Sequence, residues 1–186
     1  MNRRMMILAT AFSLVASGFA LAATKAEKQA DVRKAAQEAL AAVYKVQPSA
    51  RKAVESAAGY AVFNNFGMKI LVAGGGSGTG IAVNNKTKAV TYMKMAEVQA
   101  GLGFGIKKFR LVWVFETEKA LSDFVNSGWE LGAQATASAK VGATGASYQG
   151  AVSVAPGVWL YQLSGDSLAL ELTAKGTKYY KDGDLN

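Results

Sequence analysis

Residues Gly59 to Gly80 read GYAVFNNFGMKILVAGGGSGTG, and this stretch decides the fold class. Apolar, strand-like residues lead into a cluster of glycines, and a further apolar run begins at Ile81. A phosphate-binding loop would have Lys and Ser or Thr directly after its last glycine and would lead into a helix, and neither feature is present. The stretch therefore predicts a glycine-rich strand or hairpin, in which a strand face without side chains approaches another backbone closely.

After this hairpin, apolar runs alternate with turn residues as the strands of a sheet do. The run Arg110 to Phe115, RLVWVF, is almost continuously apolar, which predicts a central strand buried on both faces. From Leu131 to Ala143 every second residue is apolar and most are alanine, and this period of two predicts another strand. The other expected strands are Lys88 to Met93 after a turn at Asn84 to Lys86, Val152 to Leu163, and Ser167 to Thr173, parted by Pro156-Gly157 and Gly165-Asp166.

The front of the chain has helical patterns. Thr24 and Glu27 have the spacing of a capping box, and apolar residues then recur at helical spacing up to Val46. Pro48 is expected to end this helix, because proline cannot donate the next backbone hydrogen bond. The apolar stripe is mostly Ala and Val, so we expect it to dock on the protein's own sheet rather than to insert deeply into a bilayer.

Two shorter helices complete the helical content. Ser49 is in position to cap a second helix that runs to Gly59, which suits a glycine C-cap. Thr117 is expected to open a third helix from Glu118 to Val125. Together these patterns predict an α+β fold, with N-terminal helices packed on a curved, largely antiparallel, glycine- and alanine-rich β-sheet, either open or barrel-like.

The N-terminus has the features of a secretory signal peptide. Arg3 and Arg4 precede an apolar run from Met5 to Ala22, which ends in the small-x-small pattern of Ala20 and Ala22. We expect cleavage before Ala23, although the run is near the length of an uncleaved membrane anchor. No cysteine follows that could carry a lipid. The expected organisation is a signal peptide over residues 1–22 and one domain over 23–186, with a helical part at 23–58 and a β-rich core at 59–186, in a periplasmic or secreted protein.

The chain is basic and lacks the residues of most active sites. Its formal net charge is +8, and loss of Arg3 and Arg4 leaves +6. An exported protein with a positive net charge encounters anionic lipid rather than nucleic acid, so lipid is the expected partner. The alternative is that the positive charge only keeps the protein soluble. Without His or Cys, the chain cannot build a Ser-His-Asp triad, a thiol nucleophile, a disulfide or a zinc site of the usual kind. We therefore expect no catalytic centre, no metal and no cofactor.

Two carboxylate pairs remain as candidates for chemistry. Glu116 and Glu118 stand at the end of a strand beside a lysine, which is typical of a solvated turn. Asp182 and Asp184 imitate the start of a calcium loop, but the later Gly and the bidentate Glu of such a loop are missing. We interpret this second pair as part of a frayed C-terminal segment.

Five segments of the chain are similar to a known family. They occur in the same order and at similar spacing over roughly two thirds of the chain: GYAVFNNFG at 59–67, GGGSGTG at 74–80, GLGFG at 101–105, VWVFETEKALSDF at 112–124 and ELGAQATAS at 130–138. In these segments the chain resembles the SYLF domain family. The resemblance implies a lipid-binding module, since family members bind lipids, prefer phosphoinositides in eukaryotes and in some cases bind actin. The helix at 24–46 corresponds to the family's membrane-binding helix.

Two groups of residues are the expected lipid contacts. They are the basic residues of the first helix, Lys25, Lys28, Arg33 and Lys34, and the segment Lys107, Lys108, Phe109 and Arg110, where the chain departs from the family pattern. The expected function is non-enzymatic binding of anionic phospholipid or phosphoinositide-type head groups at the bacterial envelope. Binding of an acidic protein partner is the alternative, and a small outer-membrane barrel is a further one. The sequence leaves the oligomeric state open.

Overall fold

The structure is a computed structural model that describes residues 5–70, 73–100, 105–128, 130–131, 140–141, 148–165, 167–168 and 176–186. Its helices are α1 (Met5–Val46), α2 (Ser49–Ser56) and α3 (Glu118–Asn126). Its strands are β1 (Gly59–Ile70), β2 (Ala73–Asn84), β3 (Val90–Ala100), β4 (Gly105–Phe115), β5 (Glu130–Leu131), β6 (Lys140–Val141), β7 (Val152–Ala155), β8 (Val158–Ser164), β9 (Ser167–Leu168) and β10 (Gly176–Lys181).

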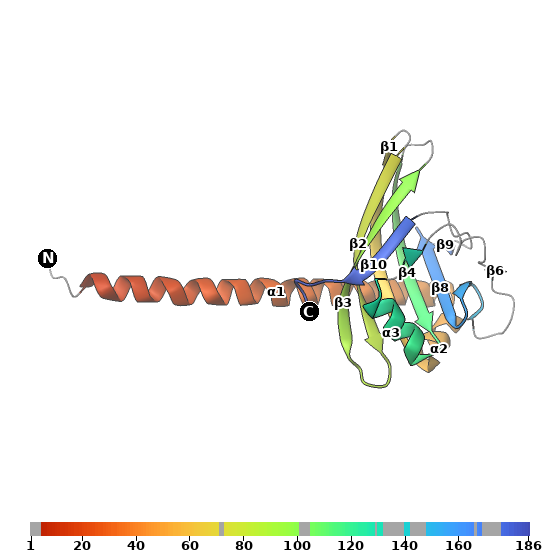
Figure 1. Ribbon diagram of the computed structural model, residues 1–186, viewed down its shortest axis with the longest axis horizontal. Coiled ribbons are helices and arrows are strands. Elements are labelled where there is room, and N and C mark those ends of the chain that lie inside the picture. Colours follow the sequence, from red (N-terminus) through yellow and green to blue (C-terminus); the bar gives the residue numbers. More distant parts are fainter. Residues whose placement is uncertain are drawn as a thin grey trace.

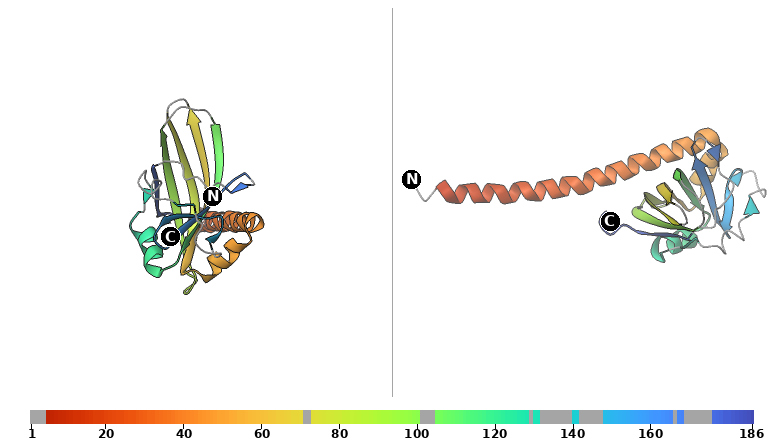
Figure 2. Two further views of the ribbon diagram at one scale, coloured as in Figure 1. Left: turned by 90° about the vertical axis from the view of Figure 1, so that its right-hand side faces the viewer. Right: turned by 90° about the horizontal axis from the view of Figure 1, so that it is seen from above.

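The strands form one curved sheet in which every pairing is antiparallel. Their order is β5-β10-β3-β2-β1-β4-β8-β7-β6, and β9 pairs with β8 (Figure 1). The strands at the two edges of the sheet, β5 and β6, are neighbours in sequence: β5 ends at Leu131 and β6 begins at Lys140. A chain of that length spans at most about 30 Å, so the two edges of the sheet must curl towards each other. The view from above in Figure 2 shows this curvature. The α+β fold with a curved antiparallel sheet is thus as predicted.

Helices α1 and α2 cover one face of the sheet. The stripe of α1 that meets the sheet is Ala36, Ala39 and Val43, all of which are buried. These residues pack on valines of the central strands, including Val62 and Val112. The predicted docking of the α1 stripe on the protein's own sheet is confirmed. Before this docked part, α1 projects far beyond the sheet (Figure 1). Among the described residues, no helix has both the length and the apolar character to cross a membrane.

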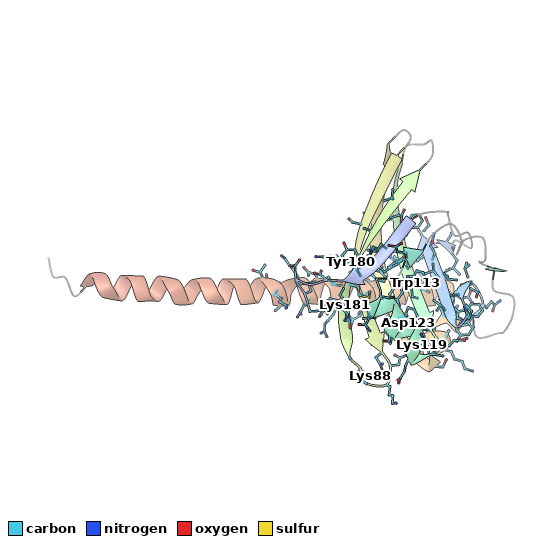
Figure 3. The ribbon with its side chains drawn as sticks, viewed as in Figure 1. Lys88, Trp113, Lys119, Asp123, Tyr180 and Lys181 are labelled. Atoms are coloured by element: carbon cyan, nitrogen blue, oxygen red, sulfur yellow. The ribbon has the colours of Figure 1, made fainter. Side chains whose placement is uncertain are left out.

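The other face of the sheet holds an aromatic core. Trp113, which is labelled in Figure 3, lies 5.2 Å from Tyr179 and 5.5 Å from Phe124 between ring centroids. Phe63 lies 5.0 Å from Tyr179. Phe124 belongs to α3, which therefore closes this face. Residues Leu111 to Phe115 of β4 are all buried and alternate between the two cores, as their apolar run predicted.

The glycine-rich stretch forms the β1–β2 hairpin, and some of its glycines are required by close packing. A Cβ on Gly80 would lie 2.1 Å from the carbonyl oxygen of Val62 and 2.6 Å from Phe63 Cδ1. A Cβ on Gly78 would lie 2.5 Å from the carbonyl oxygen of Asn64 and 2.8 Å from Met95 Cγ. Such distances are far inside van der Waals contact. The predicted close approach is therefore confirmed at these two positions.

Three predictions about helix ends are wrong. Helix α1 begins at Met5 rather than at Thr24, because the helical backbone continues through the proposed capping box. Ser49 is the first residue of α2 and not its cap, since Pro48 takes that position and no side chain caps the helix. Gly59 is the first residue of β1 rather than a C-cap, and a Cβ there would lie 2.5 Å from the Val83 carbonyl oxygen. Pro48 does follow the end of α1, as expected.

The turns and the third helix agree with the sequence. Thr117 accepts a hydrogen bond from the Ala120 backbone N–H at 3.2 Å and so caps α3. Asn84 Oδ1 accepts from the backbone N–H groups of Lys86 and Thr87, both at 2.9 Å, and this fixes the β2–β3 turn. Strand β3 begins at Val90 rather than at Lys88, because Lys88 has a φ of 60° that a strand does not allow.

The C-terminal part of the sheet was only partly predicted. Strands β7, β8 and β9 and the turns at Pro156-Gly157 and Gly165 match the prediction, whereas residues 169–173 lie outside the described residues. Strand β10, Gly176–Lys181, was not expected, although it contributes Tyr179 to the aromatic core. Most of the alternating alanine run lies outside the described residues, and its two described ends pair with β10 and β7 at opposite edges of the sheet.

Candidate functional site

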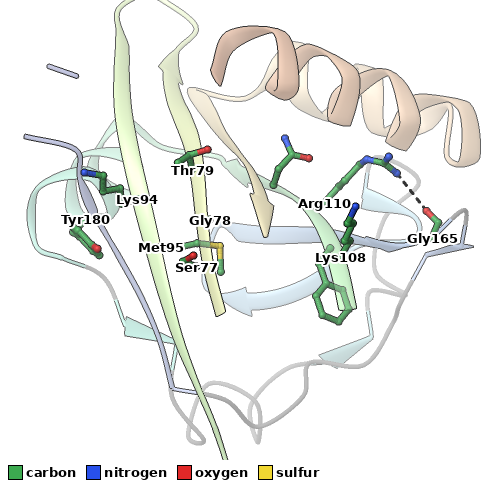
Figure 4. A pocket seen from close by; sticks show the side chains of 11 residues that line it. Ser77, Gly78, Thr79, Lys94, Met95, Lys108, Arg110, Gly165 and Tyr180 are labelled. Carbon is green, nitrogen blue, oxygen red and sulfur yellow. Dashed lines mark hydrogen bonds between the residues drawn. The ribbon is translucent and has the colours of Figure 1, made fainter. Parts of the chain in front are cut away.

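A cavity of about 680 Å³ lies beside the central strands β1 to β4 (Figure 4). Its described lining comes from β1 to β4, from β10 and from the turn after β8. The lining residues are Asn64, Ser77, Gly78, Thr79, Lys94, Met95, Lys108, Phe109, Arg110, Gly165 and Tyr180. Three of these residues are basic and none is acidic. The described lining therefore favours an anionic over a cationic occupant.

Strand register places the polar lining residues in one row on the helical face of the sheet. Arg110 pairs with Asn64, Asn64 with Thr79, Thr79 with Lys94 and Lys94 with Tyr180. Paired residues of an antiparallel sheet project to the same side. Asn64 Nδ2 donates a hydrogen bond to the Ala35 carbonyl oxygen of α1 at 2.9 Å, which identifies this side as the face that α1 crosses.

Lining residues also come from the opposite face. Met95 pairs with Gly78, and both Met95 and Phe109 belong to the aromatic core on the face away from α1. Figure 4 shows Met95 beside Gly78, where the missing side chain leaves room. The described lining therefore includes residues that project to both faces of the sheet, with the cations on the α1 face and Met95 and Phe109 on the other.

The segment 107–110 supplies two cations to this site. Lys108 is exposed, and Arg110 is half-buried with Nη1 3.5 Å from the Gly165 carbonyl oxygen, which is a long and weak hydrogen bond. Phe109 is buried on the other face, so it packs in the core instead of standing beside the cations. The side chain of Lys107 lies outside the described ones. The structure thus brings Lys108 and Arg110 together as predicted and separates Phe109 from them.

Lys94 is a site residue that sequence reasoning missed. Its Nζ lies 2.9 Å from Asp182 Oδ1 and 2.9 Å from Asp184 Oδ2. Hydrogen bonds to these two carboxylates raise the pKa of Lys94, and the bond to Lys94 lowers the pKa of Asp184. Lys94 is therefore already neutralised within the protein. An anion in the cavity would depend mainly on Lys108 and Arg110.

The prediction of a frayed C-terminal segment is wrong. Asp182 and Leu185 are 3% and 6% exposed. Asn186 Nδ2 donates to the Tyr92 carbonyl oxygen at 2.7 Å, and the Tyr92 backbone N–H donates to Asn186 Oδ1 at 2.9 Å. The segment forms a turn after β10 that is fixed to β3, because the Tyr92 carbonyl oxygen also accepts a hydrogen bond from the Asp182 backbone N–H at 2.9 Å. Only the tertiary position of β10 reveals this, because the residues alone have the composition of a solvated turn.

The basic residues of α1 divide into two groups. Lys25 Nζ donates to the Asn186 backbone oxygen at 2.9 Å, and Arg33 Nε donates to the Tyr92 hydroxyl, with its guanidinium 5.5 Å from the ring centroid. These two residues attach α1 to the body. Lys28 and Lys34 are exposed. All four predicted α1 contacts are exposed, and Lys28 and Lys34 are the two for which no hydrogen bond to the body is described.

Neither carboxylate pair forms an acidic centre. Glu116 Oε1 accepts a hydrogen bond from Trp159 Nε1 at 3.1 Å, and Glu118 forms an exposed ion pair with Lys86 at 3.6 Å. Burial, followed by the charge of Glu116, raises the pKa of Tyr148 to about 12. Within the described parts of the chain, no group of three His, Cys, Asp or Glu residues is placed to hold a metal ion.

Comparison with known proteins finds a bacterial relative. No family model matches the chain. The protein "Beta cell expansion factor A" of Aeromonas veronii is 33% identical over 162 residues, which is 87% of this chain and 60% of that protein. The chain thus spans about 60% of the length of the curated relative that it matches. Over most of its own length, the chain is similar to part of a longer bacterial protein whose name describes a factor.

Proposed function

We propose that this protein is a SYLF-type lipid-binding module that attaches to anionic phospholipid, or to phosphoinositide-type head groups, at the bacterial envelope. The observation that carries the proposal is the cavity with Lys108 and Arg110 in its described lining and no carboxylate there. The five sequence segments that resemble the SYLF family support the assignment of the module. The relative from Aeromonas veronii adds support for a bacterial origin.

The cations proposed to contact lipid lie on the face of the sheet that α1 crosses or on α1 itself. Arg110 belongs to the row of residues on the face that α1 crosses, and Lys108, two residues earlier in the same strand, projects to the same face. Lys28 and Lys34 are exposed on α1 itself. A flat anionic surface that approaches this face would therefore meet the cations of β4 and α1 together.

The strength of such a contact is limited. Each basic residue near an anionic leaflet contributes about 1 kcal/mol, so four such residues give about 4 kcal/mol, which corresponds to roughly millimolar affinity. The apolar stripe of α1 adds little, because Ala36, Ala39 and Val43 are already buried against the sheet. Stable attachment therefore needs a further contribution, either from several copies on one surface or from a lipid group that enters the cavity.

We also propose that residues 1–22 are a signal peptide and that the mature protein is periplasmic or secreted. The sequence pattern around Ala20 and Ala22 supports this proposal. The part of α1 before Thr24 belongs to the projecting section of the helix (Figure 1), and among the described side chains of α1 the first buried one is Ala36. Removal of residues 1–22 would thus leave the described core intact.

A second candidate is a protein-interaction module with an acidic partner. The same cations would serve it, and the name of the relative, which describes a factor in the expansion of beta cells, favours this candidate. Salt sensitivity does not separate the two candidates, because both contacts are electrostatic. Lipid composition does separate them.

The deciding experiment is flotation of the purified chain with vesicles of phosphatidylglycerol or phosphatidylcholine. We expect binding to phosphatidylglycerol vesicles alone, and weaker binding of the Lys108→Gln/Arg110→Gln variant by about thirtyfold, since two cations near the surface are lost. A Lys52→Gln/Lys86→Gln variant removes the same charge away from the cavity and serves as control. Equal binding to both lipids, or binding to neither, would contradict the proposal. Hydrolysed lipid in the floated fraction would contradict its non-enzymatic part.

A further inference from the structure

The four central strands continue well past the line at which α1 crosses them. Helix α1 meets β1 at Asn64, whose Nδ2 donates to the Ala35 carbonyl oxygen at 2.9 Å, and β1 continues to Ile70. Residues 65–70 of this strand add about 20 Å of length. Figure 1 shows this end of the central strands projecting beyond the rest of the sheet. We call it the projecting end, and it comprises residues 65–70, 73–78, 95–100 and 105–109.

On the face that α1 crosses, the projecting end is apolar beyond Lys108. The strand register places two rows there, both made of apolar residues and glycine. The first row holds Ile106, Met68, Gly75 and Val98, and the second holds Ile70, Ala73 and Ala100. The sequence also has no charged residue from Ile70 to Asn85 or from Val98 to Ile106. A sheet face in water normally carries polar side chains, so these rows are unlike a solvated surface.

Val98 shows that this face is open to solvent. Its side chain is 72% exposed, which is the largest value for a large apolar side chain in the described part of the chain. Its partner in β10 is Gly176, and a Cβ added there would have no atom within 4 Å. The residues of the adjoining row in β2 and β3, Ser77 and Ala96, are small and also exposed. Exposed apolar surface of this kind commonly marks a contact with a membrane or a protein.

Cations border the apolar rows. Lys108 occupies the row directly before them, and Arg110 occupies the row before that. Lys108 is exposed and Arg110 is half-buried. Two positions along a strand span about 7 Å, and the head-group layer of one leaflet is about 5–8 Å thick. With the strands directed into a bilayer and Lys108 at the level of the phosphates, the row of Val98 would lie at the start of the hydrocarbon region.

From this arrangement we infer that the projecting end inserts its apolar rows into one leaflet of an anionic bilayer, with Lys108 and Arg110 near the lipid phosphates. The bordering cations favour this occupant, because the apolar face of a second chain would offer them no anion. The inference rests on the proposed lipid-binding function and deepens it, since it names the part of the molecule that enters the bilayer. It also supplies the apolar contact that surface electrostatics lack.

The backbone limits the depth of insertion. Before Phe109, β4 pairs with β1 alone in the part of the chain that the structure describes, so its outer edge presents backbone groups without a strand partner. Hydrocarbon cannot hydrogen-bond such groups, whereas water in the head-group layer can. The expected contact is therefore shallow and confined to one leaflet.

A fluorescent label at position 98 tests the inference, and single-site labelling is possible because the sequence has no cysteine. Val98→Cys carries the environment-sensitive dye NBD. Thr87→Cys, in the exposed β2–β3 turn at the other end of the same strands, carries the dye as control. We expect phosphatidylglycerol vesicles to raise and blue-shift the emission at position 98 and to leave position 87 unchanged. Nitroxide lipids give the depth, and we expect stronger quenching from the top of the acyl chain than from the head group.

Unlabelled variants measure how much the apolar contact contributes. Val98→Asp introduces a charge into the inserted row, and Thr87→Asp adds the same charge at the other end of the strands. We expect Val98→Asp to bind phosphatidylglycerol vesicles at least about tenfold more weakly, since burial of the valine is lost. Thr87→Asp should change binding little. Both positions are exposed, so both variants should fold, and thermal melting by circular dichroism checks this.

The outcomes separate this inference from the proposed function. Flotation with phosphatidylglycerol vesicles but no emission change at position 98, or quenching by the head-group nitroxide alone, overturns the inference and leaves surface docking intact. Equal flotation of the two Asp variants also overturns it. Absence of flotation overturns both the inference and the proposed function. An emission change that depends on protein concentration without vesicles would assign this face to a second copy of the chain and overturn the inference. A vesicle-dependent blue shift with acyl-chain quenching, together with the loss in Val98→Asp, supports it.

Discussion

At the scale of single residues, the glycines of β2 have different roles although the sequence presents them as one cluster. Gly80 is needed for packing, because a Cβ would meet the carbonyl oxygen of Val62, which cannot move without breaking the β1–β2 ladder. Gly78 both allows close packing and lines the cavity. Gly176 in β10 has no atom within 4 Å of an added Cβ. The need for glycine is therefore a property of the neighbouring strand.

This difference leads to a prediction for stability. Gly80→Ala should lower the free energy of unfolding by about 2–3 kcal/mol, because the added methyl group overpacks a site bounded by backbone. Gly176→Ala should leave stability unchanged or raise it by a few tenths of a kcal/mol, since alanine restricts the unfolded chain without a clash. Urea denaturation followed by circular dichroism measures both. Equal stability of the two variants would show that close packing at Gly80 is not required.

At the scale of elements, two kinds of contact hold α1 in place, one with the sheet and one with the C-terminal segment. Its later part buries Ala36, Ala39 and Val43 in the core, whereas its earlier part is held by polar bonds to the C-terminal segment. Lys25 and Gln29 donate to the backbone oxygens of Asn186 and Leu185 at 2.9 and 2.7 Å. The C-terminal segment therefore positions the section of the helix that carries Lys28.

The role of the C-terminal segment can be tested at Asn186. Its side chain makes bonds to both backbone groups of Tyr92, so Asn186→Ala should reduce stability by about 1–2 kcal/mol. Hydrogen exchange should become faster in residues 25–33 of α1 and stay slow in residues 36–43. Asn126→Ala, which removes a bond within the exposed end of α3, is the control and should change α1 little. Unchanged exchange at 25–33 in Asn186→Ala would mean that this segment does not hold the helix.

At the scale of the whole molecule, the long α1 divides into a projecting section and a docked section (Figure 1). The expected cleavage before Ala23 falls ahead of every described residue that contacts the sheet. The protein recovered from its native host should therefore begin at Ala23 and remain folded. Intact-mass spectrometry measures this directly. A mass that includes residues 1–22 would show that the segment is retained, and the membrane anchor would then be the better interpretation.

The sequence by itself determined the fold class and many of its elements. The apolar run of β4, the turn residues at Asn84 and Pro156-Gly157, and the cap at Thr117 are local signals, because neighbouring residues decide burial and turn geometry. The family-like segments 59–67 and 112–124 form β1, β4 and α3, which together build the aromatic core. Lys108 and Arg110, which local reasoning proposed as lipid contacts, lie in the described lining of the cavity.

Only the tertiary structure decided which residues act together. Lys94, Thr79 and Asn64 are far apart in sequence and form one row with Arg110 through strand register. Asp182 and Asn186 have the composition of a frayed end, but β3 and α1 provide partners that bury them. Lys25 and Arg33, which were expected to contact lipid, are exposed and also attach α1 to the body. Local patterns specify elements because their causes are local, whereas a side chain's partners depend on long-range pairing that no short segment encodes.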